Sequence, residues 1–189
     1  MYKKYILSTI ALSLSGFAFS QTFMQGLGVN IIMQSLPGYS VKPVVGILYS
    51  PKFSFFEKDH SSLTLGLPVS FAFEGIYDTQ AGMDNNQTIG WMLDAPLMIN
   101  YNYGAGSNKK DQGKFGFFAG IGYGYHSNPF TDNSGDDVAL GESGFGPVFN
   151  TGIRIAKDPH HIFEFRFSYM KAMDISKSDI YSIGVIFNW

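Results

Sequence analysis

The sequence of 189 residues contains no cysteine. Disulfide bridges, thiolate metal sites and cysteine nucleophiles are therefore excluded. Charged residues are scarce, at 15% of the chain, where an ordinary soluble domain has roughly 25%. After residue 20 no apolar run of about 18 residues occurs without a glycine, proline or polar interruption, so no transmembrane helix is predicted there.

Aromatic residues and glycine are abundant instead. Aromatics make up 16% of the chain, and there are 22 glycines. Together with the low charge, this composition is typical of strands that lie in a membrane. The length favours one domain.

The long apolar run of this chain lies at its N-terminus. Lys3 and Lys4 precede an apolar stretch from Tyr5 to Phe17, and Ala18-Phe19-Ser20 has the small-x-small form of a cleavage site. This pattern predicts a signal peptide over 1–20 and a mature domain over 21–189. An uncleaved anchor is the alternative, and either reading implies export. The mature chain would carry 11 basic and 15 acidic residues, which does not favour nucleic acid as a partner.

Beyond the leader, apolar and polar residues alternate in segments of about ten residues. In the clearest segment, Phe163, Phe165 and Phe167 alternate with Glu164 and Arg166. The pattern predicts eight strands, over 23–33, 41–50, 62–73, 89–102, 115–126, 144–156, 161–171 and 179–189.

The same face is apolar in all eight segments. Odd positions carry bulky apolar residues such as Leu65, Ile99 and Ile153, whereas even positions carry small or polar residues such as Gly122 and Asn150. The interior of an eight-stranded barrel is too narrow for so many large side chains. We therefore predict an all-β fold, a transmembrane antiparallel up-and-down β-barrel of about eight strands, with its apolar face toward lipid and glycine and polar residues in the lumen.

Prolines and connections complete the predicted topology. Pro43, Pro68, Pro96 and Pro147 fall inside predicted strands, so each is expected at a bulge or a strand end. An even strand number places both termini on one side, which should be periplasmic. The connections expected outside are 34–40, 74–88, 127–143 and 172–178, and those expected in the periplasm are 51–61, 103–114 and 157–160.

These features together resemble the small outer-membrane β-barrels of the OmpA-barrel and OmpX kind. The last segment alternates and ends in an aromatic residue, and Tyr181, Phe187 and Trp189 make it similar to the signal that barrel-assembly machinery recognises. The resemblance covers 21–189 as a pattern and matches no functional motif of one family. It implies a bacterial outer membrane, with its lipids and lipopolysaccharide as surroundings.

Five charged residues are predicted to face the lumen: Lys42, Asp94, Arg154, Glu164 and Arg166. A buried charge without a partner costs several kcal/mol, so mutual pairing is expected. The alternative is an ion pathway lined by the same residues. Because eight strands enclose a narrow lumen, a network that plugs it is favoured.

One constellation could carry enzyme chemistry. His126, Ser127 and Glu142 could form a Ser/His/acid set, similar to that of the outer-membrane lipid A deacylases. Neighbouring strand residues point to opposite faces, however. A histidine at a loop entry followed by a turn-forming serine is therefore the favoured interpretation.

The long outer connections are acidic. Asp132, Asp136 and Asp137 could bind calcium or bridge to lipopolysaccharide through divalent cations, although their spacing does not match an EF-hand. A hydrated loop explains them equally well, and no cofactor is expected. The predicted function is a structural or surface-interaction barrel that offers loops 74–88 and 127–143 to a ligand. A lipid-modifying hydrolase and a narrow transport pore are the alternatives.

Overall fold

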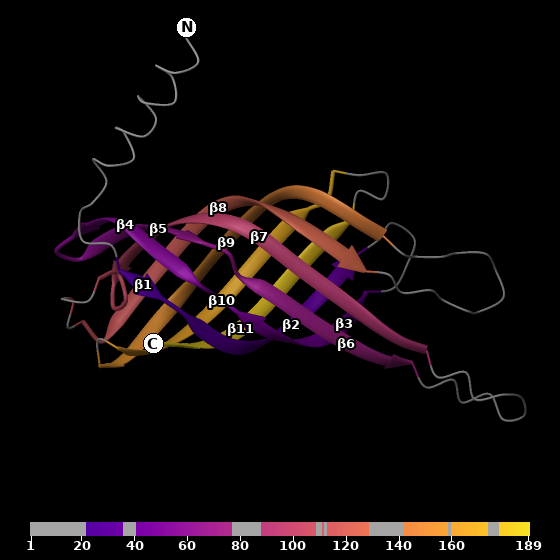
Figure 1. Ribbon diagram of the computed structural model, residues 1–189, viewed down its shortest axis with the longest axis horizontal. Helices are drawn as coiled ribbons and strands as arrows, with labels where there is room; N and C mark the ends of the chain where they lie inside the picture. The colour runs from indigo at the N-terminus through magenta and orange to yellow at the C-terminus, as the bar shows by residue number, and fades with distance from the viewer. Residues whose placement is uncertain are drawn as a thin grey trace, which may run out of the picture.

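A computed structural model describes residues 22–35, 41–76, 88–108, 111, 113–128, 142–158, 160–173 and 178–189. Within them the chain forms antiparallel strands arranged around a common axis (Figure 1). The strands are β1 (Phe23–Met24), β2 (Gly26–Ser35), β3 (Lys42–Tyr49), β4 (Lys52–Lys58), β5 (Ser61–Gly66), β6 (Val69–Ile76), β7 (Thr88–Gly104), β8 (Phe115–Asn128), β9 (Glu142–Asp158), β10 (His161–Lys171) and β11 (Asp179–Asn188). In this part of the chain no helix has the length and apolar character needed to cross a membrane.

The strands close into a ring of eight, as the alternation predicts. β5 and β6 pair with one neighbour, β7, in a single register, from Gly66 opposite Met98 to Ser70 opposite Asp94. They therefore form one wall strand with a short interruption. Likewise, β1 and β2 together form one wall strand, and β3 and β4 form the next, because β2 pairs with β3 while β1 pairs with β4. The ring closes where β11 pairs with β2.

Each of the four prolines in the predicted strands lies where backbone pairing with one neighbouring strand is interrupted. Pro68 and Pro96 face each other in the gap between the two paired stretches of β7. Pro43 lies outside the β3–β6 ladder, which begins at Gly46. Pro147 lies beyond the last β9–β10 pair, at Val148. A proline lacks the amide donor that a ladder needs, so these positions tolerate it.

The predicted inner connection 51–61 is wrong. Residues 52–58 form β4, and only Asp59 and His60 make the turn to β5. A bulge between Ser54 and Phe56 explains the error. It adds one residue, so the alternation changes parity inside the strand and no longer shows as a period of two.

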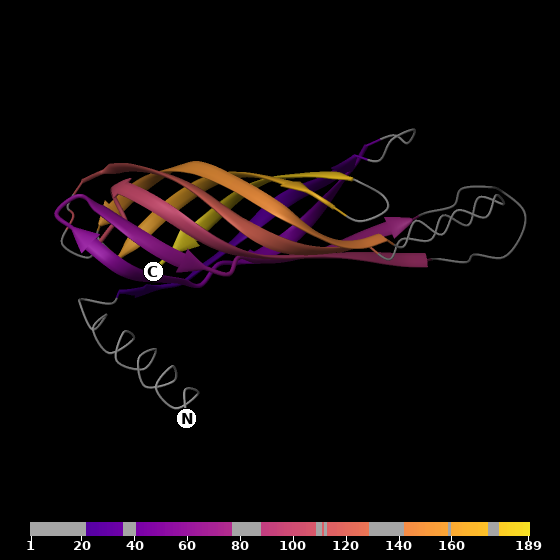
Figure 2. The same cartoon turned by 90° about the horizontal axis from the view of Figure 1, so that it is seen from above.

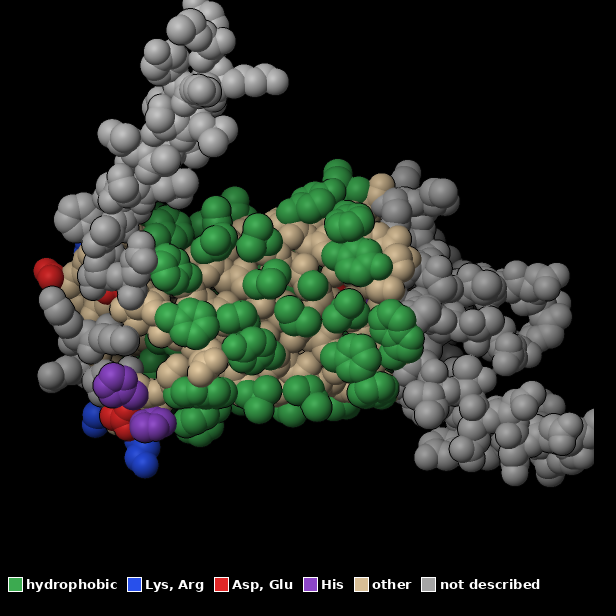
Figure 3. Space-filling view, in the orientation of Figure 1, with side chains coloured by type: hydrophobic (Ala, Val, Ile, Leu, Met, Phe, Trp, Pro, Cys, Tyr) green, Lys and Arg blue, Asp and Glu red, His purple; other side chains and the backbone are tan. Residues whose placement is uncertain are grey.

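The predicted face assignment is confirmed on the outer surface. Phe163 is 46% exposed, while its neighbour Glu164 is fully buried. Large apolar side chains cover the wall on the side shown in Figure 3, and charged side chains gather at one end. A soluble protein rarely exposes so large an apolar surface.

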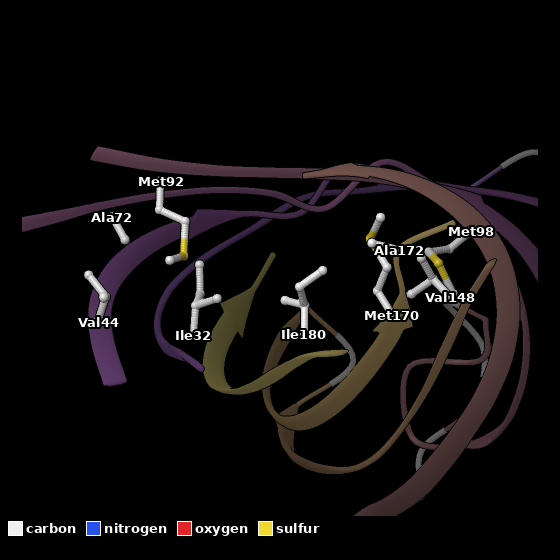
Figure 4. Packing of buried hydrophobic residues seen from close by; sticks show 9 residues of the cluster. All are labelled: Ile32, Val44, Ala72, Met92, Met98, Val148, Met170, Ala172 and Ile180. Atoms are coloured by element: carbon white, nitrogen blue, oxygen red, sulfur yellow. The ribbon is translucent and has the colours of Figure 1, made fainter. Parts of the chain in front are cut away.

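The lumen differs from the prediction of glycine and polar residues alone. It also holds a cluster of buried apolar side chains, which we call the apolar cluster: Ile32, Val44, Ala72, Met92, Met98, Val148, Met170, Ala172 and Ile180. These residues occupy even positions and point inward (Figure 4). Inside the ring they escape both water and lipid, so packing determines their placement.

The two ends of the barrel differ in their connections (Figures 1 and 2). The first described residues and Trp189 lie at one end, where Gln25 and Trp189 exchange backbone hydrogen bonds of 3.2 and 2.9 Å. This end, called the terminal end here, also holds the turn at Asp59–His60. At the opposite, distal end the strands lead into 36–40, 77–87, 129–141 and 174–177, which lie outside the described residues, as does the predicted leader.

Candidate functional site in the barrel lumen

Four charged side chains meet in the half of the lumen nearer the terminal end. Glu164 is fully buried and accepts hydrogen bonds from Arg154 Nε at 2.9 Å and from Arg166 Nε at 3.0 Å. Lys52 Nζ donates to the same carboxylate and, at 2.9 Å, to Asn188 Oδ1. We call Lys52, Arg154, Glu164 and Arg166 the charge cluster.

Strand register places the charge cluster. Arg154 of β9 lies directly opposite Glu164 of β10, and Arg166 follows two residues later on the same face. The Phe118 ring lies beside both guanidinium groups, with its centroid 4.8 Å from Arg154 Cζ and 5.6 Å from Arg166 Cζ. An aromatic face attracts cations, so the ring stabilises both positive charges.

A turn between β7 and β8 covers the cluster from the terminal end. Arg154 Nη1 donates to the Gly106 carbonyl at 3.1 Å, and Asn108 Nδ2 donates to the Lys58 carbonyl at 2.6 Å. Gly106 has a φ of 73°, and a Cβ there would lie 2.8 Å from Ile162 Cδ1. The left-handed φ of this turn therefore favours glycine.

A hydrogen-bonded aspartate–histidine pair lies farther along the lumen. Asp94 of β7 and His126 of β8 face each other across the ladder, and Asp94 Oδ1 bonds to His126 Nδ1. His126 is 2% exposed, and its Nε2 has no hydrogen-bond partner among the described residues. An aspartate that orients a histidine supplies two of the three members of a catalytic triad, but a nucleophile must then reach Nε2.

No protein-family model and no curated protein sequence matches this chain. Solved structures do match it. The attachment invasion locus protein Ail of Yersinia pestis, in complex with the heparin analogue sucrose octasulfate, is 11% identical, with a TM-score of 0.59 over 90% of this chain and 100% of that one. Neisserial surface protein A is 10% identical, with a TM-score of 0.58 over 89% and 97%.

The chain has the fold of a small outer-membrane β-barrel. At identities this low, the likeness shows the fold and leaves function to be argued from the site. Ail and neisserial surface protein A are both bacterial outer-membrane barrels.

Within the barrel, three of the five predicted lumen charges meet: Arg154, Glu164 and Arg166. Asp94 pairs with His126 instead of joining them. The side chain of Lys42 lies outside the described residues. Lys52 was missed because it falls in the stretch predicted as a turn, although its even number fits the lumen face.

The predicted Ser/His/acid set is not brought together in the described residues. Ser127 Oγ lies 2.8 Å from Ser143 Oγ, on the neighbouring strand, while His126 turns into the lumen toward Asp94. The side chain of Glu142 is outside the described residues. The adjacent Ser127 and His126 point to opposite faces, as strand geometry requires.

The remaining predicted sites are the acidic residues proposed to bind calcium and the aromatic residues of the predicted assembly signal. Asp132, Asp136 and Asp137 are outside the described residues, and the described residues contain no group of metal-binding side chains. Tyr181, Phe187 and Trp189 take the outward parity of β11, with Trp189 45% exposed and its ring stacked 6.1 Å from that of Phe187.

Proposed function

We propose that this protein is an outer-membrane barrel with a structural or surface-interaction role, which anchors its long distal connections at the cell surface. One observation carries the proposal: the outward faces of all eight wall strands are apolar, while charged and amide side chains are buried inside. Lipid is the solvent that favours this inverted arrangement.

The proposal includes a lumen that is closed to steady ion flow. The charge cluster and the turn at Gly106 fill the half near the terminal end. The apolar cluster fills the distal half, where Ile32, Ala72 and Met98 have no exposed surface. Both fillings support a plug, since a pore needs a continuous hydrated path.

Sequence charge suggests the chemistry of the surface partner. The distal connections and the strand ends beside them carry eight acidic residues and one basic residue: Glu74, Asp78, Asp84, Asp132, Asp136, Asp137, Glu142, Asp174 and Lys177. A polyanion such as the sulfated heparin analogue of Ail would be repelled here. We therefore propose a basic surface ligand, or lipopolysaccharide bridged through divalent cations, at loops 74–88 and 127–143.

The proposed orientation places the terminal end in the periplasm. Removal of a leader over 1–20 and assembly through Tyr181, Phe187 and Trp189, which barrel-assembly machinery would recognise, lead to this arrangement. It would leave the acidic connections outside.

Gel mobility and protease accessibility test the proposal together. We expect the detergent-extracted protein to give a β-type circular dichroism spectrum and to migrate differently before and after heating. Protease added to intact cells should cut within 129–141 and leave Asp59–His60 intact. A water-soluble protein without heat-modifiable mobility would refute the membrane barrel, and cleavage at Asp59–His60 alone would reverse the orientation.

The two alternatives have distinct signatures. A lipid-modifying hydrolase would change the mass of lipid A or phospholipid, and the change would vanish in His126→Ala. A transport pore would give steady single-channel currents in planar bilayers. We expect neither result from the purified protein.

A further inference from the structure

A cavity of about 40 Å³ lies in the lumen between the charge cluster and the apolar cluster. Leu48, Val148, Met170 and Ile180 contribute apolar walls, and Arg166 supplies the positive charge. A space of this volume holds one or a few water-sized groups. Such a group must find polar partners, so the atoms that face the cavity determine what it binds.

Arg166 brings an unused hydrogen-bond donor to this cavity. Its Nε bonds to Glu164, and its Nη2 bonds to Glu164 and, at 3.1 Å, to Ser50 Oγ. Its Nη1 is buried and has no hydrogen-bond partner among the described residues. Arg166 as a whole is only 7% exposed. A buried guanidinium donor without an acceptor is costly, which favours an acceptor at this position.

Two serine hydroxyls face the same cavity as donors. Asn30 Nδ2 donates to Ser70 Oγ at 2.9 Å and to Ser182 Oγ at 3.1 Å, and both serines line the cavity. Each hydroxyl oxygen thus already accepts a hydrogen bond. Its own hydrogen remains available to donate to a third group.

The charges around the cavity do not cancel. The charge cluster sets three basic side chains against one carboxylate. Asp94 also lines the cavity, with its Oδ1 bonded to His126, so two carboxylates stand against the three basic side chains and one positive charge is in excess. An excess of positive charge in a buried site is stabilised by a bound anion.

We infer that this cavity is a binding site for a small monovalent anion of the chloride, bromide or formate class, held by Arg166 Nη1 and the hydroxyls of Ser70 and Ser182. The site goes beyond the proposed anchoring role. It gives the lumen a ligand that neutralises the charge cluster.

Bromide is the probe for the test, because it scatters anomalously and replaces chloride. Crystals of the full mature barrel soaked in sodium bromide should show an anomalous peak within hydrogen-bond distance of Arg166 Nη1. In solution, ³⁵Cl line broadening by the detergent-solubilised barrel should be competed by bromide and not by gluconate, which is too large for the cavity.

Variants separate the site from general electrostatics. Arg166→Gln should weaken anion binding about tenfold or more, since it removes a charge-assisted donor. The double variant Ser70→Ala with Ser182→Ala keeps all charges and should also weaken binding more than about tenfold. The matched control is Lys171→Gln, which removes a basic side chain that is bonded to Asp179 and does not line the cavity; it should keep specific, bromide-competed binding.

Two results would overturn the inference. One is a barrel without a bromide peak at Arg166 and without competed ³⁵Cl broadening. The other is equal binding in the wild type and in the double serine variant. If Arg166→Gln does not fold, the serine variant alone decides.

Discussion

In the half of the lumen near the terminal end, one carboxylate, Glu164, accepts hydrogen bonds from Lys52, Arg154 and Arg166. In the distal half, apolar side chains such as Ile32 and Met92 fill the lumen instead. The charged half depends on every partner being present, because a buried charge left alone is costly. The apolar half loses only the contacts of the group removed. Loss of one partner should therefore destabilise the whole charged half, whereas each truncation in the apolar half should lower stability only by its own contribution.

The largest effect should come from the centre of the charged half. Glu164→Gln leaves Lys52, Arg154 and Arg166 without their shared carboxylate. Breaking a buried pair in this way costs about 3–5 kcal/mol. Urea unfolding in detergent micelles, followed by tryptophan fluorescence, measures the loss. A loss below about 1 kcal/mol, as for an exposed pair, would show that the cluster is not desolvated.

A neighbouring pair of isoleucines tests the apolar half. Ile32 is fully buried in the lumen, whereas Ile31 is 43% exposed on the outer face. Ile32→Ala should cost about 2–4 kcal/mol because it leaves a cavity. Ile31→Ala should cost less, since lipid or detergent fills the space. Equal losses in the same unfolding assay would contradict the assignment of the two faces.

Asn30 lies at the boundary between the two halves and should have a smaller effect. Its Nδ2 donates hydrogen bonds to Ser70 of β6 and to Ser182 of β11. Asn30→Ala removes both hydrogen bonds, so we expect a loss of about 1–2 kcal/mol. The double variant with Glu164→Gln measures coupling: additive losses would mean that the halves are independent.

The smallest effect should lie outside both halves, at the turn between β9 and β10. The hydrogen bond from His161, at 2.8 Å, and that from the His160 amide hold the pKa of Asp158 below its ordinary value of 3.8. A depressed carboxyl pKa adds stability that is present above the unfolded value and is lost as the pH falls through the folded value. Asp158→Asn should therefore lower stability slightly at neutral pH, where the carboxylate contributes, and flatten the shallow decline in stability below pH 3.8. A change confined to neutral pH would assign the effect to another group.

The ring and its outward face could be predicted because each wall strand repeats with a period of two, as in Phe163, Phe165 and Phe167. The contents of the lumen were harder to predict. Even positions hold Ile32 and Met92 as well as polar residues, and alternation alone does not show how a closed interior packs. β4 was missed because the bulge before Phe56 shifts its parity.

Which side chains pair within the lumen depends on the register between neighbouring strands, and this register could not be predicted from the alternation in the sequence. Asp94 meets His126 because these two residues fall opposite each other on β7 and β8. The turn between those strands determines that offset, and one residue more or less would turn each side chain to the other face. Lys52 and Glu164 are 112 residues apart, and only ring closure brings them together.

The hydrogen bond between Lys52 and Asn188 links the strand that closes the ring, β11, to the charge cluster. Asn188 accepts from Lys52 and donates to the Ile162 carbonyl at 3.3 Å, so β11 joins β4 to β10 across the lumen. Contacts of such long sequence separation cost loop-closure entropy before they stabilise the fold. The same strand, β11, closes the ring against β2 and brings Asn188 to Lys52. Closure of the wall and completion of its ionic interior are therefore coupled.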